Sequence, residues 1–158
     1  MATREEFFFF LNKWSQKTYK SHPILYLGFH GDRGGIFLGA LRKSPRLSLE
    51  EIGAALEGKC NGRVFVFGSC ETIKAGPWAM KKFLERTQAL AVCGYMREID
   101  WMQSAALDLL VLTAMQEATF TLHGIGKIAK LIRSRSAGLC KKLEFRIITR
   151  PARSGGSP

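Results

Sequence analysis

The sequence predicts an α/β fold with a mostly parallel sheet. Three short apolar runs, Ile24–Phe29, Val64–Phe67 and Ala89–Tyr95, have the length and composition of strands that are buried on both faces. Segments with helical patterning separate these runs, and such alternation is typical of parallel strands joined by helices. The chain has 158 residues, enough for one full hydrophobic core. We therefore expect a single domain over residues 1–150.

Capping patterns mark the starts of the first two helices. Thr3 precedes a helix whose apolar positions run from Phe7 to Trp14, and Ser48 precedes a helix that Gly58 ends. The first of these helices contains four consecutive Phe residues. Consecutive positions cover more than one face of a helix, so we expect this helix to be buried broadly.

The segment between the first strand and the second helix is rich in glycine and basic residues. We expect His30–Gly35 to form a flexible turn, because it holds three glycines. Ile36–Gly39 should follow as a short, locally paired strand, and Arg42–Arg46 as a basic loop.

The second half of the chain adds two long helices. Pro77 suits the first turn of a helix that reaches about Thr87. Asp100 caps a longer helix that reaches about Phe120, and we expect residues 123–126 to end it.

The C-terminal segment is strongly basic. Lys127–Arg133 has the pattern of a short amphipathic helix, Leu143–Thr149 alternates like an edge strand, and residues 151–158 should be a disordered basic tail. The net charge is +11, and +8 of it lies from His123 onward, where 9 Lys and Arg residues face one acidic residue. This charge indicates either a solvated end or contact with a polyanion, such as nucleic acid or anionic lipid.

The composition argues against several classes of protein. The longest apolar segment, Trp101–Phe120, carries Asp108 and Glu117 together with two Gln residues, so we expect a core helix and no membrane contact. The four cysteines show no C-x-x-C spacing, so we expect neither zinc nor another cofactor. No secretory signal is recognisable, which favours the reducing cytoplasm.

Two reactive side chains follow the first two strands. His30 comes directly after Phe29, and Cys70 lies shortly beyond Phe67. The carboxyl ends of parallel strands meet at one edge of a sheet, so we expect these side chains to lie side by side. An imidazole beside a thiol can take its proton and form a nucleophile–base pair. The N–H groups of Gly31 and Cys70 are candidate oxyanion donors, and Gly31 has no Cβ to block a substrate.

Cys70 also has a plain structural interpretation. Cys93 occupies a similar place on the third strand without a His partner, and a buried free cysteine behaves as a small hydrophobe. The His30-Gly31 pair is the observation that favours a functional thiol over a core residue.

The combination resembles the caspase-like cysteine peptidases, the group of caspases, gingipains and separases. An apolar strand ending in His30-Gly31 stands about 40 residues before an apolar strand that leads to a small residue and Cys70, a spacing compatible with that of caspases. Ile24–Tyr95 is most similar to the bacterial CHAT-like branch, and the continuation through Trp101 resembles an uncharacterised bacterial family within it.

This resemblance implies a specific fold and activity. The fold is a three-layer α/β/α sandwich with a mostly parallel sheet. Cys70 is then the nucleophile, His30 the base and Gly31 an oxyanion donor. The implied reaction is hydrolysis of a peptide or amide bond in a peptide or protein substrate, within a bacterial stress or defence pathway.

Two features depart from the group. Residues 68–72 read G-S-C-E-T in place of the caspase pentapeptide, so cleavage after aspartate is not implied. The chain also opens with a helix where the fold normally opens with a central strand, and an uncovered sheet edge makes a homodimer an expected partner arrangement.

Acidic residues near the expected site are candidates for a substrate pocket. Members of the group that cut after Arg or Lys use acidic pockets, which makes Glu71 and Asp100 the candidates here. Asp100 has a sufficient structural role as a helix N-cap, and Glu71 fits a surface position equally well.

Two alternatives to a peptidase stay open. One is a non-catalytic caspase-like interaction module with an unreactive Cys70 and a stable protein partner. The other is a nucleic-acid-binding protein that contacts phosphates through Lys127–Arg153. In that segment only Phe145 could stack on a base, which argues against the second alternative.

Overall fold

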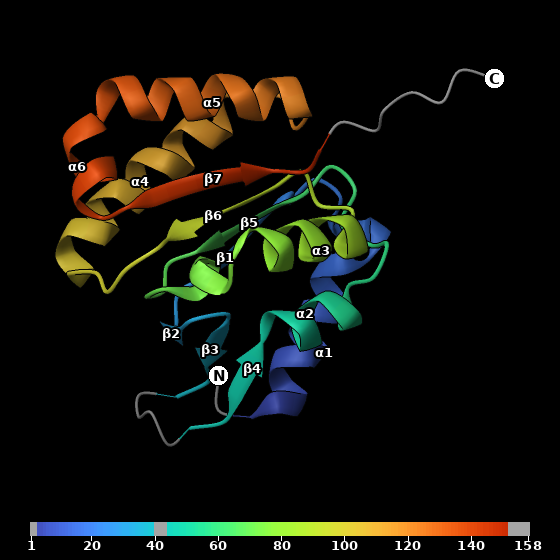
Figure 1. Ribbon diagram of the computed structural model, residues 1–158. Coiled ribbons are helices and arrows are strands. Elements are labelled where there is room, and N and C mark those ends of the chain that lie inside the picture. The colour runs from blue at the N-terminus through green and yellow to red at the C-terminus, as the bar shows by residue number, and fades with distance from the viewer. Residues whose placement is uncertain (1–2, 40–43, 152–158) are drawn as a thin grey trace.

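A four-stranded sheet forms the centre of the computed structural model, which describes residues 3–39 and 44–151. The strands lie in the order β1-β5-β6-β7 (Figure 1) and comprise Ile24–Leu27, Val64–Phe67, Ala91–Tyr95 and Phe145–Thr149. β1, β5 and β6 run parallel, while β7 pairs antiparallel with β6 at the edge. The prediction of an α/β fold with a mostly parallel sheet is confirmed.

Helices cover both faces of this sheet (Figure 1). One face carries α1, α2 and α3, which comprise Arg4–Ser15, Leu49–Ala55 and Pro77–Thr87. The other carries α4, α5 and α6, which comprise Trp101–Gln116, Leu122–Arg135 and Ala137–Lys142. Two 3₁₀ turns, η1 and η2, span Lys17–Tyr19 and Thr72–Ala75. Alternate residues of β5 serve the two cores, since Phe65 and Phe67 pack with the first set of helices and Val64 and Val66 with the second.

The expected caps start the helices. The hydroxyl of Thr3 accepts a hydrogen bond from the N–H of Glu6, and Asp100 accepts one from the N–H of Gln103. At α2 the Ser48 hydroxyl and the Glu51 carboxylate each accept from the other's backbone N–H, which completes a capping box. These caps could be predicted from the sequence because each joins residues only three positions apart.

A small antiparallel sheet follows β1, and it corrects the expected flexible turn. Its strands β2, β3 and β4 comprise His30–Asp32, Gly35–Phe37 and Arg46–Ser48. β1 ends at Leu27, so His30 begins β2 and does not end β1. Arg46, expected in a basic loop, begins β4, where its guanidinium binds the Asp32 carboxylate on β2. Residues 42 and 43 of that expected loop lie outside the described residues.

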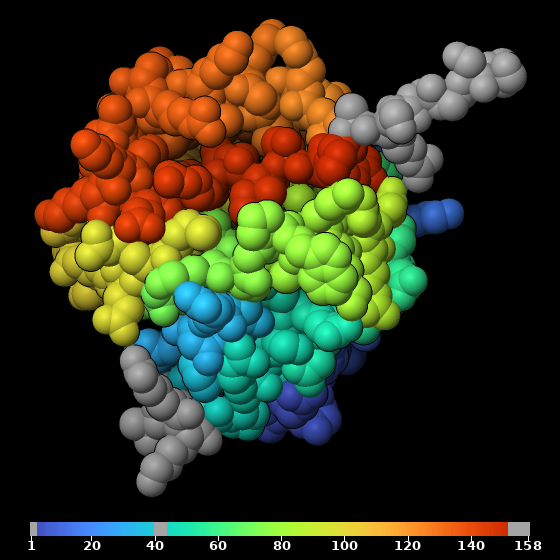
Figure 2. All heavy atoms as spheres, viewed as in Figure 1, coloured from blue at the N-terminus to red at the C-terminus, as the bar shows by residue number. Residues whose placement is uncertain are grey.

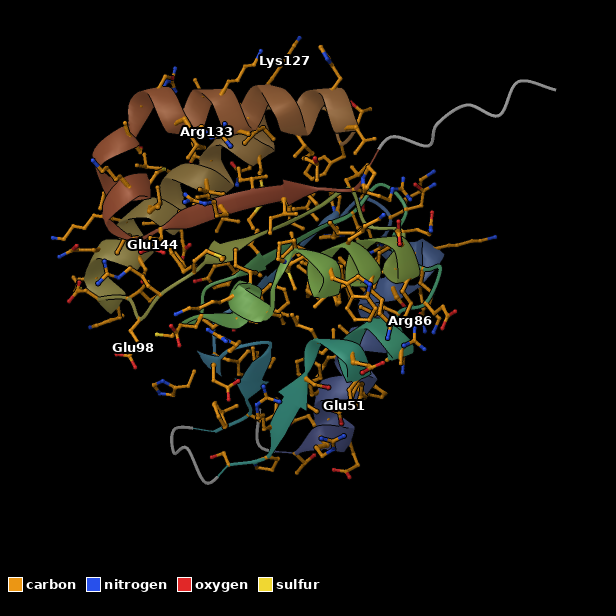
Figure 3. All side chains as sticks on the ribbon, in the orientation of Figure 1. Glu51, Arg86, Glu98, Lys127, Arg133 and Glu144 are labelled. Carbon is orange, nitrogen blue, oxygen red and sulfur yellow. The ribbon has the colours of Figure 1, made fainter. Side chains whose placement is uncertain are left out.

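The C-terminal segment is more helical than expected. α4 ends at Gln116, and residues 123–126, expected to end it, instead open α5, because the Thr121 hydroxyl accepts from the N–H of Gly124 and caps a new helix. The basic residues of this segment therefore lie largely on folded helices. Lys127 points away from the sheet on the outer side of α5 (Figure 3), and α5 and α6 (orange) cover one side of the molecule in Figure 2. Apart from Pro151, the expected tail at 151–158 lies outside the described residues.

The expectation that α1 is buried broadly is wrong. Phe7 and Leu11 are buried, four residues apart on one face, whereas Phe9 and Phe10 are 62% and 47% exposed. A surface helix buries one stripe, so a run of four aromatics necessarily leaves some of them in solvent. No helix within the described residues is long and apolar enough to cross a membrane.

Candidate functional site

A cavity of about 690 Å³ opens where β1 and β5 end. His30 and Cys70 both line it, although His30 begins β2 of the small sheet and Cys70 lies in the loop after β5 of the main sheet. Most of the wall is aromatic or aliphatic and comes from β1, the small sheet and the start of α4, with Tyr26, Phe29, Phe37, Leu38, Ile99 and Trp101 as its large side chains. The cavity therefore offers a thiol and an imidazole to a ligand held against an apolar wall.

Hydroxyl groups fix the loop that carries Cys70. The Thr72 hydroxyl lies 3.0 Å from the carbonyl oxygen of Gly35 on β3 and donates to it. Its own oxygen lies 2.7 Å from the Ser69 hydroxyl, which is therefore the donor of that second bond. The N–H of Gly34 donates to the Thr72 carbonyl. Thr72 therefore binds the loop after β5 to the small sheet, and the Ser69–Thr72 hydrogen bond closes the loop around Cys70.

Glu71 completes the turn of this loop. Its φ of 52° lies in the left-handed region, which is costly for a residue with a Cβ. Its N–H donates to the Arg97 carbonyl, and its carboxylate binds the Lys74 ammonium. The carboxylate is thus engaged locally, and Glu71 is not among the residues that line the cavity. The same holds for Asp100, whose carboxylate caps α4.

Gly31 lies against the Cys70 loop. A Cβ at Gly31 would stand 2.6 Å from the carbonyl oxygen of Cys70 and would also collide with the Thr72 hydroxyl. The missing side chain therefore has a packing role, because it lets β2 approach the loop and so keeps His30 near Cys70. The sequence alone predicts a different role for the absent Cβ, namely room for a substrate.

The two reactive groups are unengaged in this structure. Within the described residues, neither the Cys70 thiol nor the His30 imidazole makes a hydrogen bond, and the four described cysteines are free thiols. His30 is exposed and Cys70 half-buried. The backbone N–H of Cys70 likewise donates a hydrogen bond to no described backbone group. Catalytic hydrogen bonds are often loose without a ligand, so this arrangement is compatible with a pair that a substrate brings together.

A buried carboxylate with two tyrosines forms part of the site, and the sequence reasoning missed it. Asp108 on α4 is 4% exposed and accepts hydrogen bonds from Tyr26 at 2.8 Å and from Tyr95 at 2.7 Å. Burial raises the pKa of Asp108, and the two tyrosine hydrogen bonds partly oppose that rise. Tyr26 and Asp108 both line the cavity.

The helical spacing contained a signal for this cluster. Ser104, Asp108, Val111 and Met115 recur at intervals of three or four residues and are all buried. An acidic residue on the buried stripe of an otherwise apolar helix requires a polar partner inside the protein. Sequence reasoning had used Asp108 only as an argument against a membrane helix.

The described cavity wall carries few charged side chains. Among the residues that the structure describes, no Lys or Arg lines the cavity, and Asp108 is the acidic residue that does. Those residues also contain no group of three His, Cys, Asp or Glu side chains placed to hold a metal ion.

Comparison with known proteins assigns the chain to a family. Residues 2–149 match the protein family described as a family of unknown function, DUF6642. No curated protein matches the sequence.

Proposed function

We propose that this chain, which belongs to the DUF6642 family of unknown function, is a caspase-like cysteine hydrolase that cleaves amide bonds. The observation that carries the proposal is the shared cavity, which Cys70 and His30 both line where the parallel strands end. Helices on both faces of the sheet are compatible with the three-layer sandwich of the caspase-like group. The free thiols within the described residues support a reducing compartment, and we propose the cytoplasm.

The reaction proceeds through a thioester. His30 takes the proton of the Cys70 thiol, and the sulfur bonds to the carbonyl carbon of the substrate. The N–H groups of Cys70 and Gly31 donate to the oxyanion that forms. The C–N bond then breaks, the leaving amine takes the proton from His30, and an acyl group stays on the sulfur. Water, losing a proton to His30, hydrolyses this thioester and restores the thiol.

The cavity wall favours uncharged side chains beside the bond that is cut. A substrate carboxylate would meet no described cation there, and Asp108, the one carboxylate among the described lining residues, already accepts from two tyrosines. Burial of a large apolar or aromatic side chain against Tyr26 and Trp101 requires no buried charge. We therefore propose peptides with such a residue before the scissile bond as substrates.

The first experiment ranks the thiols without a substrate. Native protein is treated with limiting iodoacetamide over a pH series, and peptide mass spectrometry follows each cysteine. We expect Cys70 to react first, because it is the half-buried thiol in a cavity while Cys60 and Cys93 are fully buried. The His30→Ala variant should lose the reactivity of Cys70 near neutral pH while keeping its folding.

The outcome separates the proposal from its main alternative. If Cys70 stays as unreactive as Cys93 until the protein is unfolded, the dyad does not exist and the chain is a non-catalytic interaction module. The unengaged thiol and imidazole are the observation that keeps this alternative open. Hydrolysis of a fluorogenic peptide library by the wild-type protein, and its persistence in Cys70→Ala, would also remove the hydrolase proposal.

A further inference from the structure

One edge of the main sheet is open and apolar. Within the described part of the chain β1 pairs only with β5, and the N–H groups of Val64 and Gly68 donate to the carbonyls of Pro23 and Leu27. Because backbone groups alternate along a strand, those of Ile24 and Tyr26 point away from β5. No hydrogen bond from a described residue outside the strand reaches them. The strand is Ile-Leu-Tyr-Leu and carries no charge.

An exposed apolar helix face adjoins this edge. Trp101, Met102 and Leu109 on α4 are 75%, 63% and 67% exposed. Trp101 and Leu109 lie eight residues apart on a stripe that passes beside Asp108, and Asp108 is hydrogen-bonded to Tyr26 on β1. We call the outer edge of β1 together with Tyr26, Trp101, Met102 and Leu109 the β1–α4 surface.

The size of this surface is that of an interface. At about 200 Å² for a large side chain, the exposed parts of its four side chains amount to roughly 500 Å². This value is at the upper end of the apolar patches on monomers and supplies most of the roughly 800 Å² that each partner buries in a standard interface. The free backbone groups of β1 add to it.

We propose that the β1–α4 surface is the interface of a homodimer. Its occupant must present an unpaired strand edge and an apolar helix face together, and a second copy of this chain does so. A two-fold axis through β1 would pair the two β1 strands antiparallel and bring each α4 stripe against the partner's. α4 contains no Lys or Arg, so two chains of net charge +11 would meet away from their basic helices.

The opposite edge of the sheet shows why β1 is the interface and β7 is not. β7 carries Arg146, which is exposed, and is followed by Arg150. Charged residues on an edge strand oppose pairing with another chain, and β1 lacks this protection. The inference does not depend on the hydrolase proposal. Tyr26 and Trp101 nevertheless belong both to the β1–α4 surface and to the cavity wall, so the partner would lie at the rim of the cavity.

Sedimentation equilibrium of the purified chain over a range of concentrations tests the proposal. We expect a dimer that Leu109→Glu converts to a monomer with an unchanged circular dichroism spectrum, because the site is exposed in the monomer. Phe9→Glu is the matched control: Phe9 is a similarly exposed apolar residue on α1, at 62%, and its substitution should leave the dimer intact. Hydrogen exchange should show protected amides at Ile24 and Tyr26 in the wild type and exposed ones in Leu109→Glu.

Each contrary result overturns the proposal. A chain that is monomeric at every concentration has no such interface. A dimer that survives Leu109→Glu, or that Phe9→Glu dissociates, uses another surface. A dimer whose β1 amides exchange freely does not pair through β1, and open-ended association would contradict the two-fold arrangement.

Discussion

Cys70 and Cys93 lie on two neighbouring segments of the molecule and have opposite surroundings. Cys93 lies inside β6, fully buried and flanked by Val66 of β5 and Ile147 of β7. Cys70 lies beyond the end of β5, half-buried in a cavity that His30 also lines. The contrast shows that a thiol just past the end of a parallel strand is more accessible to solvent than one inside a strand with hydrogen-bonded neighbours on both sides.

The same substitution at the two thiols should give opposite results. Cys70→Ala should lower peptide hydrolysis by at least about 10³-fold without changing the free energy of unfolding, because it removes the nucleophile and little packing. Cys93→Ala should keep the activity and lose roughly 1 to 2 kcal/mol of stability through the cavity it leaves. Peptide turnover and urea unfolding of both variants make the comparison, and equal activity in the two would erase the distinction.

Gly31→Ala should disturb the surroundings of Cys70 and leave those of Cys93 unchanged. The new Cβ would stand 2.6 Å from the Cys70 carbonyl oxygen, so β2 and the loop must separate. We expect a loss of about 1 to 3 kcal/mol and slower alkylation of Cys70. Gly126→Ala on α5 is the control, since nothing lies within 4 Å of its added Cβ and the helix should gain up to about 1 kcal/mol. Equal stability in the two variants would contradict the packing role of Gly31.

Alkaline pH should lower the free energy of unfolding through buried thiols such as that of Cys93. Burial, together with the charge of Asp108, raises the pKa of Cys93, and burial raises the pKa of Cys60 to about 12. Unfolded thiols ionise near pH 8.5, so the stability that these groups contribute is complete below that pH and falls as the pH rises, by up to about 1.4 kcal/mol per unit for each thiol. Urea unfolding measured on both sides of this pH should show the fall, and Cys93→Ala should make it shallower.

The smallest effect should come from Tyr26→Phe. Asp108 links the surroundings of the two cysteines, because it lines the cavity that Cys70 also lines and its charge helps to raise the pKa of Cys93. Tyr26 donates a hydrogen bond to one of its carboxylate oxygens. Loss of this hydrogen bond should cost about 1 kcal/mol at neutral pH and less in acid, where Asp108 is protonated and needs fewer donors. Tyr19→Phe serves as the control, and an equal cost for both variants at both pH values would show that Asp108 does not depend on Tyr26.

Sequence reasoning succeeded where a short segment determines its own structure. The alternation of buried strands and the caps at Thr3, Ser48 and Asp100 depend on nearby residues, and the observed elements begin as expected. The locally paired strand expected at Ile36–Gly39 corresponds to β3, but its neighbours β2 and β4 were missed, because Arg46 joins the small sheet through contacts with Asp32, 14 residues away. Residues 123–126 were misread because the glycines that suggested a helix end, Gly124 and Gly126, lie inside α5.

The site was predictable only in part. The apolar runs made visible the two parallel strands that precede His30 and Cys70, and both residues line one cavity, although His30 begins β2 and does not end β1. The Thr72 contact with Gly35 and the Asp108 contacts with Tyr26 and Tyr95 join segments far apart in the sequence. The helical spacing indicates that Asp108 is buried and needs a polar partner, but no local pattern identifies that partner. Whether the pair catalyses a reaction depends on such contacts and remains a prediction.

The register between β1 and β5 has a consequence for the order of folding. Ile24 pairs with Val64, 40 residues along the chain, whereas His30 pairs with Phe37 within one hairpin. Short hairpins close in microseconds, and parallel pairing across a long loop is slower. We therefore expect the hairpin with His30 to form early and to meet the Cys70 loop only when the main sheet closes. If Cys70 and His30 form the proposed thiol–imidazole pair, a chain emerging from the ribosome would not assemble that pair until its folding is complete.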